Sequence, residues 1–351
     1  MSDAVAVVLF AGITAYAVFA GADFGAGFWD LIAGGAVRGE RPRAIVQHSI
    51  GPVWEANHVW LIFVLVVLWT GFSEVFQSIM LTLFVPLSLA ALGIVLRGSS
   101  FAFRKEVFRT SSRRNFGAAF ASASVLVPYC MGAVAGAIAS GRVPAGGKSG
   151  DPWSSWINPT SILGGLLAVT ACAYLSAVYL VWDSNRLGDP EMVEYFRRRA
   201  VIAAVVAGFL ALCGIVVLHD DANYVFEELT SRALPLVILS ALCGVGCLVL
   251  MLRDNHRGGR ILAMGAVASV VVAWGVAQWP YMLPTSMKVS QAAAPDPTLA
   301  TILIVFAVAA VVILPSMGLL YVLDQKSLLD PDDSGPTELR TADGSMPAAE
   351  S

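Results

Sequence analysis

Charge is scarce in this sequence. Asp, Glu, Lys and Arg together make up 13% of the 351 residues, whereas apolar residues make up 57% and the mean hydropathy is +0.73. So little polar material cannot coat a water-soluble particle of this size. The net charge is -3 and the basic residues form short clusters rather than one long stripe, which excludes a nucleic-acid-binding footprint. The chain is therefore expected to lie in a lipid bilayer and to bind no nucleic acid.

Cysteine and histidine are also few. The five cysteines fall inside apolar runs, where a disulfide framework of the secreted kind is not expected, so they are interpreted as small packing residues. Of the four histidines, only His58 is expected at membrane depth, and a bis-histidine haem needs two ligands that face each other there. We expect no metal site and no haem bound by this chain alone.

Long uncharged runs dominate what remains. Runs of about twenty residues can cross about 30 Å of hydrocarbon as helices. They predict an all-α, polytopic membrane helix bundle of about nine transmembrane helices in residues 1–323, and the polar residues 324–351 predict a disordered cytoplasmic tail. Prolines at 86, 128 and 315 predict kinks. The predicted spans are 4–28, 52–73, 75–97, 115–140, 159–182, 200–218, 234–252, 261–283 and 299–323.

The basic residues predict which way the bundle faces. Of the 22 Lys and Arg residues, the loops on one side hold only Arg142, Lys148, Arg232 and Lys288. Because cytoplasmic loops carry the excess of basic residues, the N-terminus is expected outside and the C-terminus in the cytoplasm. Aromatic residues near the predicted outer ends are interpreted as interfacial anchors, namely Trp69, Phe72, Trp153, Trp156, Trp274, Trp279 and Tyr281.

Four ionisable residues fall inside the predicted spans, where such side chains are costly and usually face a bundle interior or a partner. At about 1.5 Å per residue, Asp23 lies about 28 Å from the start of the first span. Glu55 and His58 begin the second span on the same side, and Arg97 ends the third. The four residues are therefore expected in one layer near the cytoplasmic surface.

Each of these residues has a structural and a functional interpretation. Glu55, next to Asn57, is either an electrostatic helix cap or a proton-conducting carboxylate, and His58 is either a proton relay or a structural histidine. Arg97 either snorkels to lipid phosphates or pairs with Asp23 or Glu55. Asp23 marks either a helix-breaking turn or a carboxylate buried against a partner chain. The glycines of Gly21–Gly27 and around Gly132–Gly136 allow close helix approach.

Four segments between residues 21 and 286 carry a resemblance to a known family. They are Gly21–Gly27, the string SIGPVWEANHVWLI at 49–62, the pair LRG at 96–98 and FAFR at 101–104, and QWPYMLPTS at 278–286. Together they resemble subunit II of the cytochrome bd quinol oxidases. The string around Trp54, Glu55 and Asn57 is the most specific of the four.

The resemblance implies a multi-pass protein of the bacterial plasma (inner) membrane, paired with a subunit I that carries haem b and haem d type cofactors. Subunit I would oxidise quinol and reduce dioxygen to water, while this subunit, itself haem-free, would line a cytoplasmic proton route. It implies a proton-pathway role for Glu55 and quinone contact near Trp54 and Arg97. The residue pattern adds His58 and Asp23 to the predicted proton pathway, and charge tuning or quinone contact at Arg97 and Asn57. The resemblance leaves open a structural quinone and a small single-helix subunit. An acidic position of some members falls at Ala102 here.

Two other classes compete with this interpretation. A secondary transporter is suggested by interrupted helices and charges in the membrane, although the predicted polar layer lies at one face rather than at the midplane. The other alternative is a purely structural membrane anchor, in which Asp23, Glu55 and Arg97 form a buried ion network that carries no protons.

Overall fold

The structure, a computed structural model, describes residues 1–35, 38–50, 53–106, 110–254 and 258–325. Within these ranges the side chains of residues 50, 53–57, 101–106 and 110–116, and several after residue 313, are outside the description. The chain divides into two compact units, Met1–Ala307 and Val308–Ser351, and each is described by itself. The predicted tail lies almost wholly outside the described residues.

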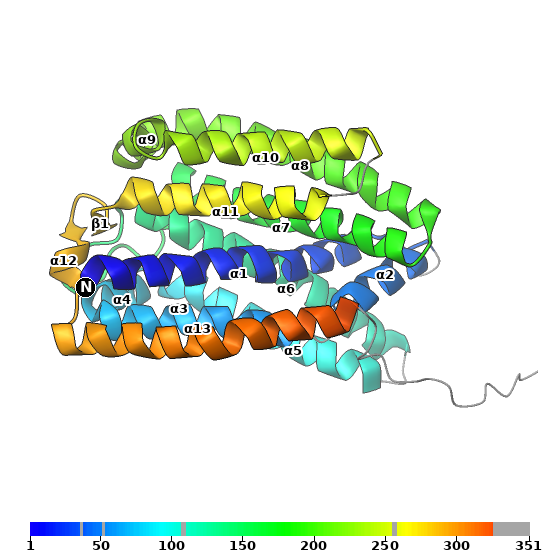
Figure 1. Cartoon of the computed structure of the whole chain (residues 1–351), viewed down its shortest axis with the longest axis horizontal. Coiled ribbons are helices and arrows are strands. Elements are labelled where there is room, and N and C mark those ends of the chain that lie inside the picture. Colours follow the sequence, from blue (N-terminus) through cyan, green and yellow to red (C-terminus); the bar gives the residue numbers. More distant parts are fainter. Residues whose placement is uncertain (36–37, 51–52, 107–109, 255–257, 326–351) are drawn as a thin grey trace, which may run out of the picture. The chain divides into compact units, whose positions relative to one another are not determined.

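About 82% of the chain is helical, and the long helices of the first unit run side by side (Figure 1). The second unit contains the end of the last helix, with Pro315 inside it. The long helices are α1 (Ser2–Leu31), α3 (Val53–Gly71), α5 (Phe84–Glu106), α6 (Thr110–Ala139), α7 (Pro159–Arg186), α8 (Pro190–Asp221), α10 (Leu234–Leu252), α11 (Gly259–Gln278) and α13 (Asp296–Gln325). The short elements are α2 (Glu40–Ile50), α4 (Ser73–Thr82), α9 (Asn223–Thr230), α12 (Val289–Ala292), β1 (Tyr281–Leu283) and β2 (Met287–Lys288).

The predicted class is confirmed: the chain is a polytopic helix bundle. Among the described residues, seven helices are long and apolar enough to cross a membrane, or eight if α3 and α4 form one bent span. The described apolar part of α5, Phe84–Ser100, is shorter than these. The count of about nine spans and their orientation remain predictions.

The third predicted span, 75–97, is wrong as a single helix. Helix α3 ends at Gly71, the chain turns by 117° into α4, and α4 ends at Thr82 before α5 begins at Phe84. Pro86 then lies in the first turn of α5, where its missing N–H costs no helical hydrogen bond, so it starts a helix instead of kinking one. Phe72 at the turn is fully buried, so its predicted role as an interfacial anchor is wrong.

The predicted span 261–283 is too long at its end. Helix α11 stops at Gln278 because Pro280 offers no N–H and forces Trp279 into an extended conformation. Strands β1 and β2 then form a small antiparallel hairpin, with Tyr281 opposite Lys288. The buried Gln278 side chain donates from Nε2 to the Met282 oxygen at 2.6 Å, which fixes the hairpin against the helix.

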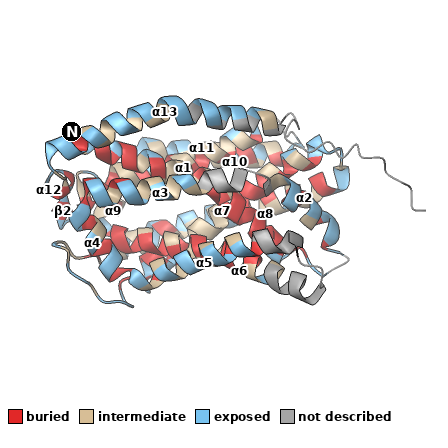
Figure 2. Cartoon of the chain, turned by 90° about the horizontal axis from the view of Figure 1, so that it is seen from below, coloured by how far each residue is buried: buried red, intermediate tan, exposed pale blue. Residues whose placement is uncertain are grey.

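Helix α1 lies at the centre of the packing, in contact with α3, α6, α7 and α11. In the most apolar stretches of α1, α6 and α7, 44%, 50% and 56% of positions are buried, against 11% in α8 and in α10 (Figure 2). Glycines permit this closeness: a Cβ at Gly25 would lie 1.9 Å from the Cys172 oxygen of α7. One at Gly132 of α6 would lie 2.3 Å from the Gly164 oxygen of α7. The close approach expected at both glycine runs is confirmed, and it occurs within the chain.

Helix α8 begins with a side-chain cap. The Asp189 carboxylate accepts from the Met192 N–H at 3.1 Å and also pairs with Arg41 of α2. The hydrogen bond from the Met192 main-chain N–H, followed by the Arg41 guanidinium, holds the pKa of Asp189 below its ordinary value. This contact joins α2 to the start of α8.

Candidate functional site

Arg97 lies at the centre of the candidate site. It sits on α5 and its residue surface is only 2% exposed. Its Nη2 donates to the main-chain oxygen of Asp23 on α1 at 2.9 Å, and its Nε donates to Ser124 Oγ on α6 at 3.1 Å. A cation so deeply buried needs such partners. Arg97 therefore joins α1, α5 and α6, and snorkelling to lipid phosphates is excluded by its burial.

Aromatic rings cover the guanidinium of Arg97. Its Cζ lies 4.7 Å from the ring centroid of Phe24 and 4.9 Å from that of Phe120. Ser124 is held in turn, because its hydroxyl donates to the Phe120 oxygen at 2.7 Å. Gly27 makes room for Ser124, since a Cβ there would lie 2.1 Å from Ser124 Oγ. Electrostatic attraction to ring faces in a dry site is strong enough to help hold a buried cation.

His58 of α3 is linked to this cluster through Phe24. The two ring centroids are 5.9 Å apart, and the Tyr16 ring of α1 lies 6.5 Å from His58. The Tyr16 hydroxyl oxygen is buried, and it has no hydrogen-bond partner within the part of the chain that the structure describes. Because leaving a buried hydroxyl unpaired is costly, this position suits a bound water. His58 and Tyr16 thus extend the polar cluster along α1 toward its N-terminal half.

The structure brings together three of the residues predicted from sequence, namely Asp23, His58 and Arg97. Asp23 is buried, 8% exposed, on a continuous α1, so the helix-breaking turn considered for it is wrong. Glu55, Trp54 and Asn57 belong to the first turns of α3, but their side chains lie outside the described residues. The same holds for the side chain at Ala102.

The sequence does not predict two contacts of the cluster, Ser124 and Phe120, or a further buried acid on α1, Asp30. Ser124 and Phe120 lie in an Ala- and Ser-rich run with no charge to mark it. Asp30, seven residues after Asp23 and so on the same face of α1, is 4% exposed and pairs with Arg43 Nε at 2.9 Å. That seven-residue spacing is the signal for Asp30 in the sequence, but the first predicted span ends at residue 28 and so excludes it.

Further ion pairs join helices at both ends of the bundle. At the end where α2 lies, Arg260 of α11 pairs with Asp183 of α7 at 2.9 Å. At the end where Met1 lies, Asp221 of α8 accepts from Arg142 Nη1 at 3.0 Å and from the Thr160 hydroxyl at 2.6 Å. Among the described residues, no group of three or more His, Cys, Asp or Glu side chains is placed to hold a metal ion.

This fold and site define a class: a polytopic α-helical membrane protein with a charged cluster buried among α1, α3, α5 and α6. The model of one family, the cytochrome bd terminal oxidase subunit II family, matches residues 1–324. The chain belongs to this family and is a subunit of a cytochrome bd-type oxidase. The resemblance found in the sequence is confirmed.

Relatives with curated names agree. The putative cytochrome bd menaquinol oxidase subunit II of Bacillus subtilis is 22% identical over 313 residues, 86% of this chain and 88% of its own length. The cytochrome bd-I ubiquinol oxidase subunit 2 of Escherichia coli is 23% identical over 310 residues, 77% of this chain and 78% of its own length. A chain of the solved bd oxidase from Geobacillus thermodenitrificans shares the fold, with a TM-score of 0.73 at 23% identity, covering 94% of this chain and 99% of that one.

Proposed function

We propose that this chain is the haem-free subunit of a quinol:dioxygen oxidoreductase in the bacterial plasma membrane. In this proposal it stabilises a haem-bearing subunit I and takes up cytoplasmic protons for the reduction of dioxygen to water. Family membership and the menaquinol and ubiquinol oxidase names of its relatives support the reaction. The observation that supports the proton route is the cluster of buried Asp23 and Arg97 with half-buried His58, at the end of the bundle where α3 begins.

The haems of the complex supply the redox chemistry, and the proton steps belong to residues of this chain. Glu55, three residues before His58 on the same helix and therefore on the same face, takes the proton from the cytoplasmic side. His58 receives it at a ring nitrogen and passes it to water at the Tyr16 hydroxyl. The Asp23 carboxylate holds negative charge in the same layer and balances the proton in transit.

Arg97 is a positioning residue in this scheme. Its two hydrogen bonds and its two ring contacts hold the main chain of Asp23 and the ring of Phe24, against which His58 packs. Its fixed positive charge lowers the cost of a carboxylate nearby. Quinone contact at Trp54, Asn57 and Arg97 gains no support from Arg97, because a side chain so fully enclosed offers little surface to a quinone head group.

Substitution of Glu55 tests the proposal. Glu55→Gln removes the titrating proton but keeps size and hydrogen bonding, so the assembled complex should keep its haem spectrum while quinol-driven oxygen consumption falls by about tenfold or more. Glu55→Asp should retain most of the activity. Glu74→Gln is the matched control, because Glu74 is an exposed carboxylate in the first turn of α4, away from the cluster. Wild-type respiration by Glu55→Gln would make Glu55 a helix cap or structural ion partner.

A further inference from the structure

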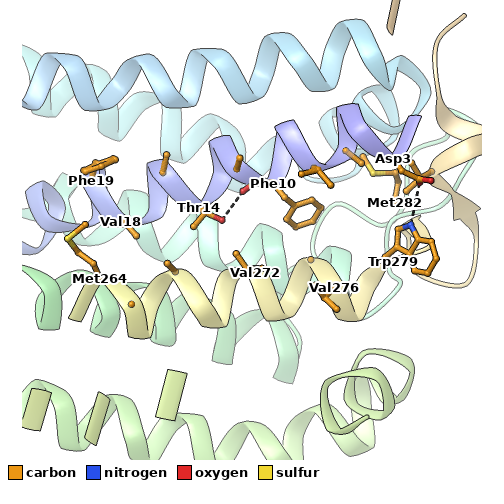
Figure 3. A pocket seen from close by; sticks show the side chains of 18 of the residues that line it. Asp3, Phe10, Thr14, Val18, Phe19, Met264, Val272, Val276, Trp279 and Met282 are labelled. Carbon is orange, nitrogen blue, oxygen red and sulfur yellow. Dashed lines mark hydrogen bonds between the residues drawn. The ribbon is translucent and has the colours of Figure 1, made fainter. Parts of the chain in front are cut away.

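A long apolar groove runs between α1 and α11, on a different face of α1 from the contacts with Arg97 and His58. Its volume is about 830 Å³, and it extends from Asp3 and Trp279 at one end to Phe19 and Met264 at the other (Figure 3). From Asp3 to Phe19 the rise along α1 is about 24 Å. That exceeds half of the roughly 30 Å hydrocarbon core, so the groove can take a whole lipid chain from one leaflet.

Small residues on the two facing helices create this groove. Ala11 and Ala15 of α1 and Gly265 and Ala268 of α11 line it and leave the space between the helices unfilled. Where a large residue does face across, it is accommodated by glycine, since a Cβ at Gly275 would lie 2.6 Å from the Phe10 ring. Protein interiors are close-packed, so an apolar space of this size within a bilayer fills with hydrocarbon.

Polarity in the lining is confined almost entirely to one end. The Thr14 hydroxyl, midway along, donates to the Phe10 oxygen of its own helix at 2.8 Å and so offers little to a ligand. At the end where Met1 lies, the exposed Asp3 carboxylate accepts from Trp279 Nε1 at 3.4 Å (Figure 3). Lys288 Nζ lies 5.9 Å from the centroid of Tyr281, another lining residue. Arg232 stands at the same end, with its Cζ 5.2 Å from the centroid of Trp279, and pairs with Glu228 at 3.1 Å. The rim of the groove thus carries charges of both signs beside two aromatic rings.

We infer that this groove binds a phospholipid of the ethanolamine class. One acyl chain lies between α1 and α11, the head-group phosphate faces Lys288, and the head-group ammonium faces Asp3. Trp279 and Tyr281 mark the depth of the head group, because such rings settle at the membrane interface. A neutral isoprenoid quinone would use neither charge, and an anionic glycerol phospholipid would meet repulsion from Asp3.

A matched pair of substitutions on α11 tests occupancy. Val272 lines the groove, whereas Val270 is similarly exposed on the same helix but does not line it. The complete oxidase complex is washed free of loosely held lipid and examined by native mass spectrometry. Wild type and Val270→Trp should retain an ethanolamine phospholipid. Val272→Trp should retain at least about tenfold less of this lipid. Equal retention by wild type and Val272→Trp, or equal loss in both valine variants, contradicts the inference.

Head-group selection is tested without any change in packing, which keeps the inference falsifiable even if Val272→Trp does not assemble. Complexes in nanodiscs of mixed phosphatidylethanolamine and phosphatidylglycerol are compared for the bound lipid. Asp3→Asn should lower the preference for the ethanolamine lipid by about two- to fivefold, the scale of an exposed ion pair. Lys288→Gln should lower retention of both lipids. Unchanged selectivity in Asp3→Asn, a quinone in place of the lipid, or a bound polypeptide helix would each overturn the assignment.

Discussion

Arg97 on α5 holds the main chain, rather than only a side chain, of Asp23 on α1, through a 2.9 Å hydrogen bond from Nη2. At the same time its Nε donates a hydrogen bond to Ser124 Oγ on α6. A lysine is a compact point charge and cannot reproduce this planar, two-directional donor set. The position therefore requires the geometry of a guanidinium as well as a positive charge.

Arg97→Lys should accordingly destabilise the complex. The loss is expected at about 1.5–3 kcal/mol for each hydrogen bond to the charged group that is not replaced. It should appear as a lower Tm and a lower yield of assembled oxidase. Arg198→Lys is the control, since the Arg198 side chain is 74% exposed. Equal Tm values for the two variants would refute the structural role given to Arg97.

Gly25→Ala should disrupt the packing of α1 on α7. The new Cβ would lie 1.9 Å from the Cys172 oxygen, and a main-chain atom cannot rotate away as a side chain can. Overpacking of this kind costs about 1–3 kcal/mol or more. Gly208→Ala is the matched control, because a Cβ at that position of α8 meets no atom within 4 Å. Both variants are compared by thermal unfolding of the purified complex, and a normal Tm for Gly25→Ala would contradict the close contact.

The Asp189 cap should make stability depend on pH at the acid end. Its pKa in the folded chain is below the ordinary value of 3.8, chiefly through the Met192 N–H. A carboxylate with a lowered pKa contributes stability above the unfolded pKa, and this contribution is lost as the pH falls through the folded pKa. Tm should therefore drop below pH 3.8 in wild type. Asp189→Asn, which keeps an acceptor but cannot titrate there, should show a smaller drop, and an identical profile would argue against the cap.

The N-out, C-in orientation predicts the outcome of reporter fusions. A reporter in the C-terminal tail should be active in the cytoplasm, and one in the loop containing Lys148 should be active outside, because that loop is poor in basic residues. The opposite pattern would move the cluster of Asp23, His58 and Arg97 to the outer face. The proton route proposed here would then start on the wrong side.

Long apolar runs predicted most of the long helices because hydrophobic length is a local property of sequence. The predicted span 234–252 coincides with α10, whereas α8 begins ten residues earlier than expected because its charged first turns lie outside an apolar run. The polar helix α2 and the eight-residue helix α9 carry no such signal. The break at Leu83 was invisible for the opposite reason, since apolar residues continue on both sides of it.

The depth of the candidate-site residues in the membrane could be predicted from the sequence, but the direction in which each side chain points could not. Counting rise per residue placed Asp23, His58 and Arg97 in one layer, and the structure brings them together. The rotation of each helix about its axis depends on neighbours distant in sequence. For this reason the sequence does not predict that Arg97 contacts Ser124 and Phe120, or that His58 contacts Tyr16.

The partners of α1 lie at different distances along the chain, so its contacts can form only in a certain order during synthesis. Asp30 finds its partner Arg43 only 13 residues later, so that buried charge is neutralised early in synthesis. Arg97, which binds the Asp23 oxygen, lies 74 residues later in the chain. The Trp29 indole donates to the Ala173 oxygen at 2.9 Å, and Ala173 lies 144 residues later. Helix α1 therefore completes these contacts only after residue 173 of α7 has been made. Until about half of the chain has left the ribosome, the face of α1 that packs against α7 has no partner helix and is exposed to lipid.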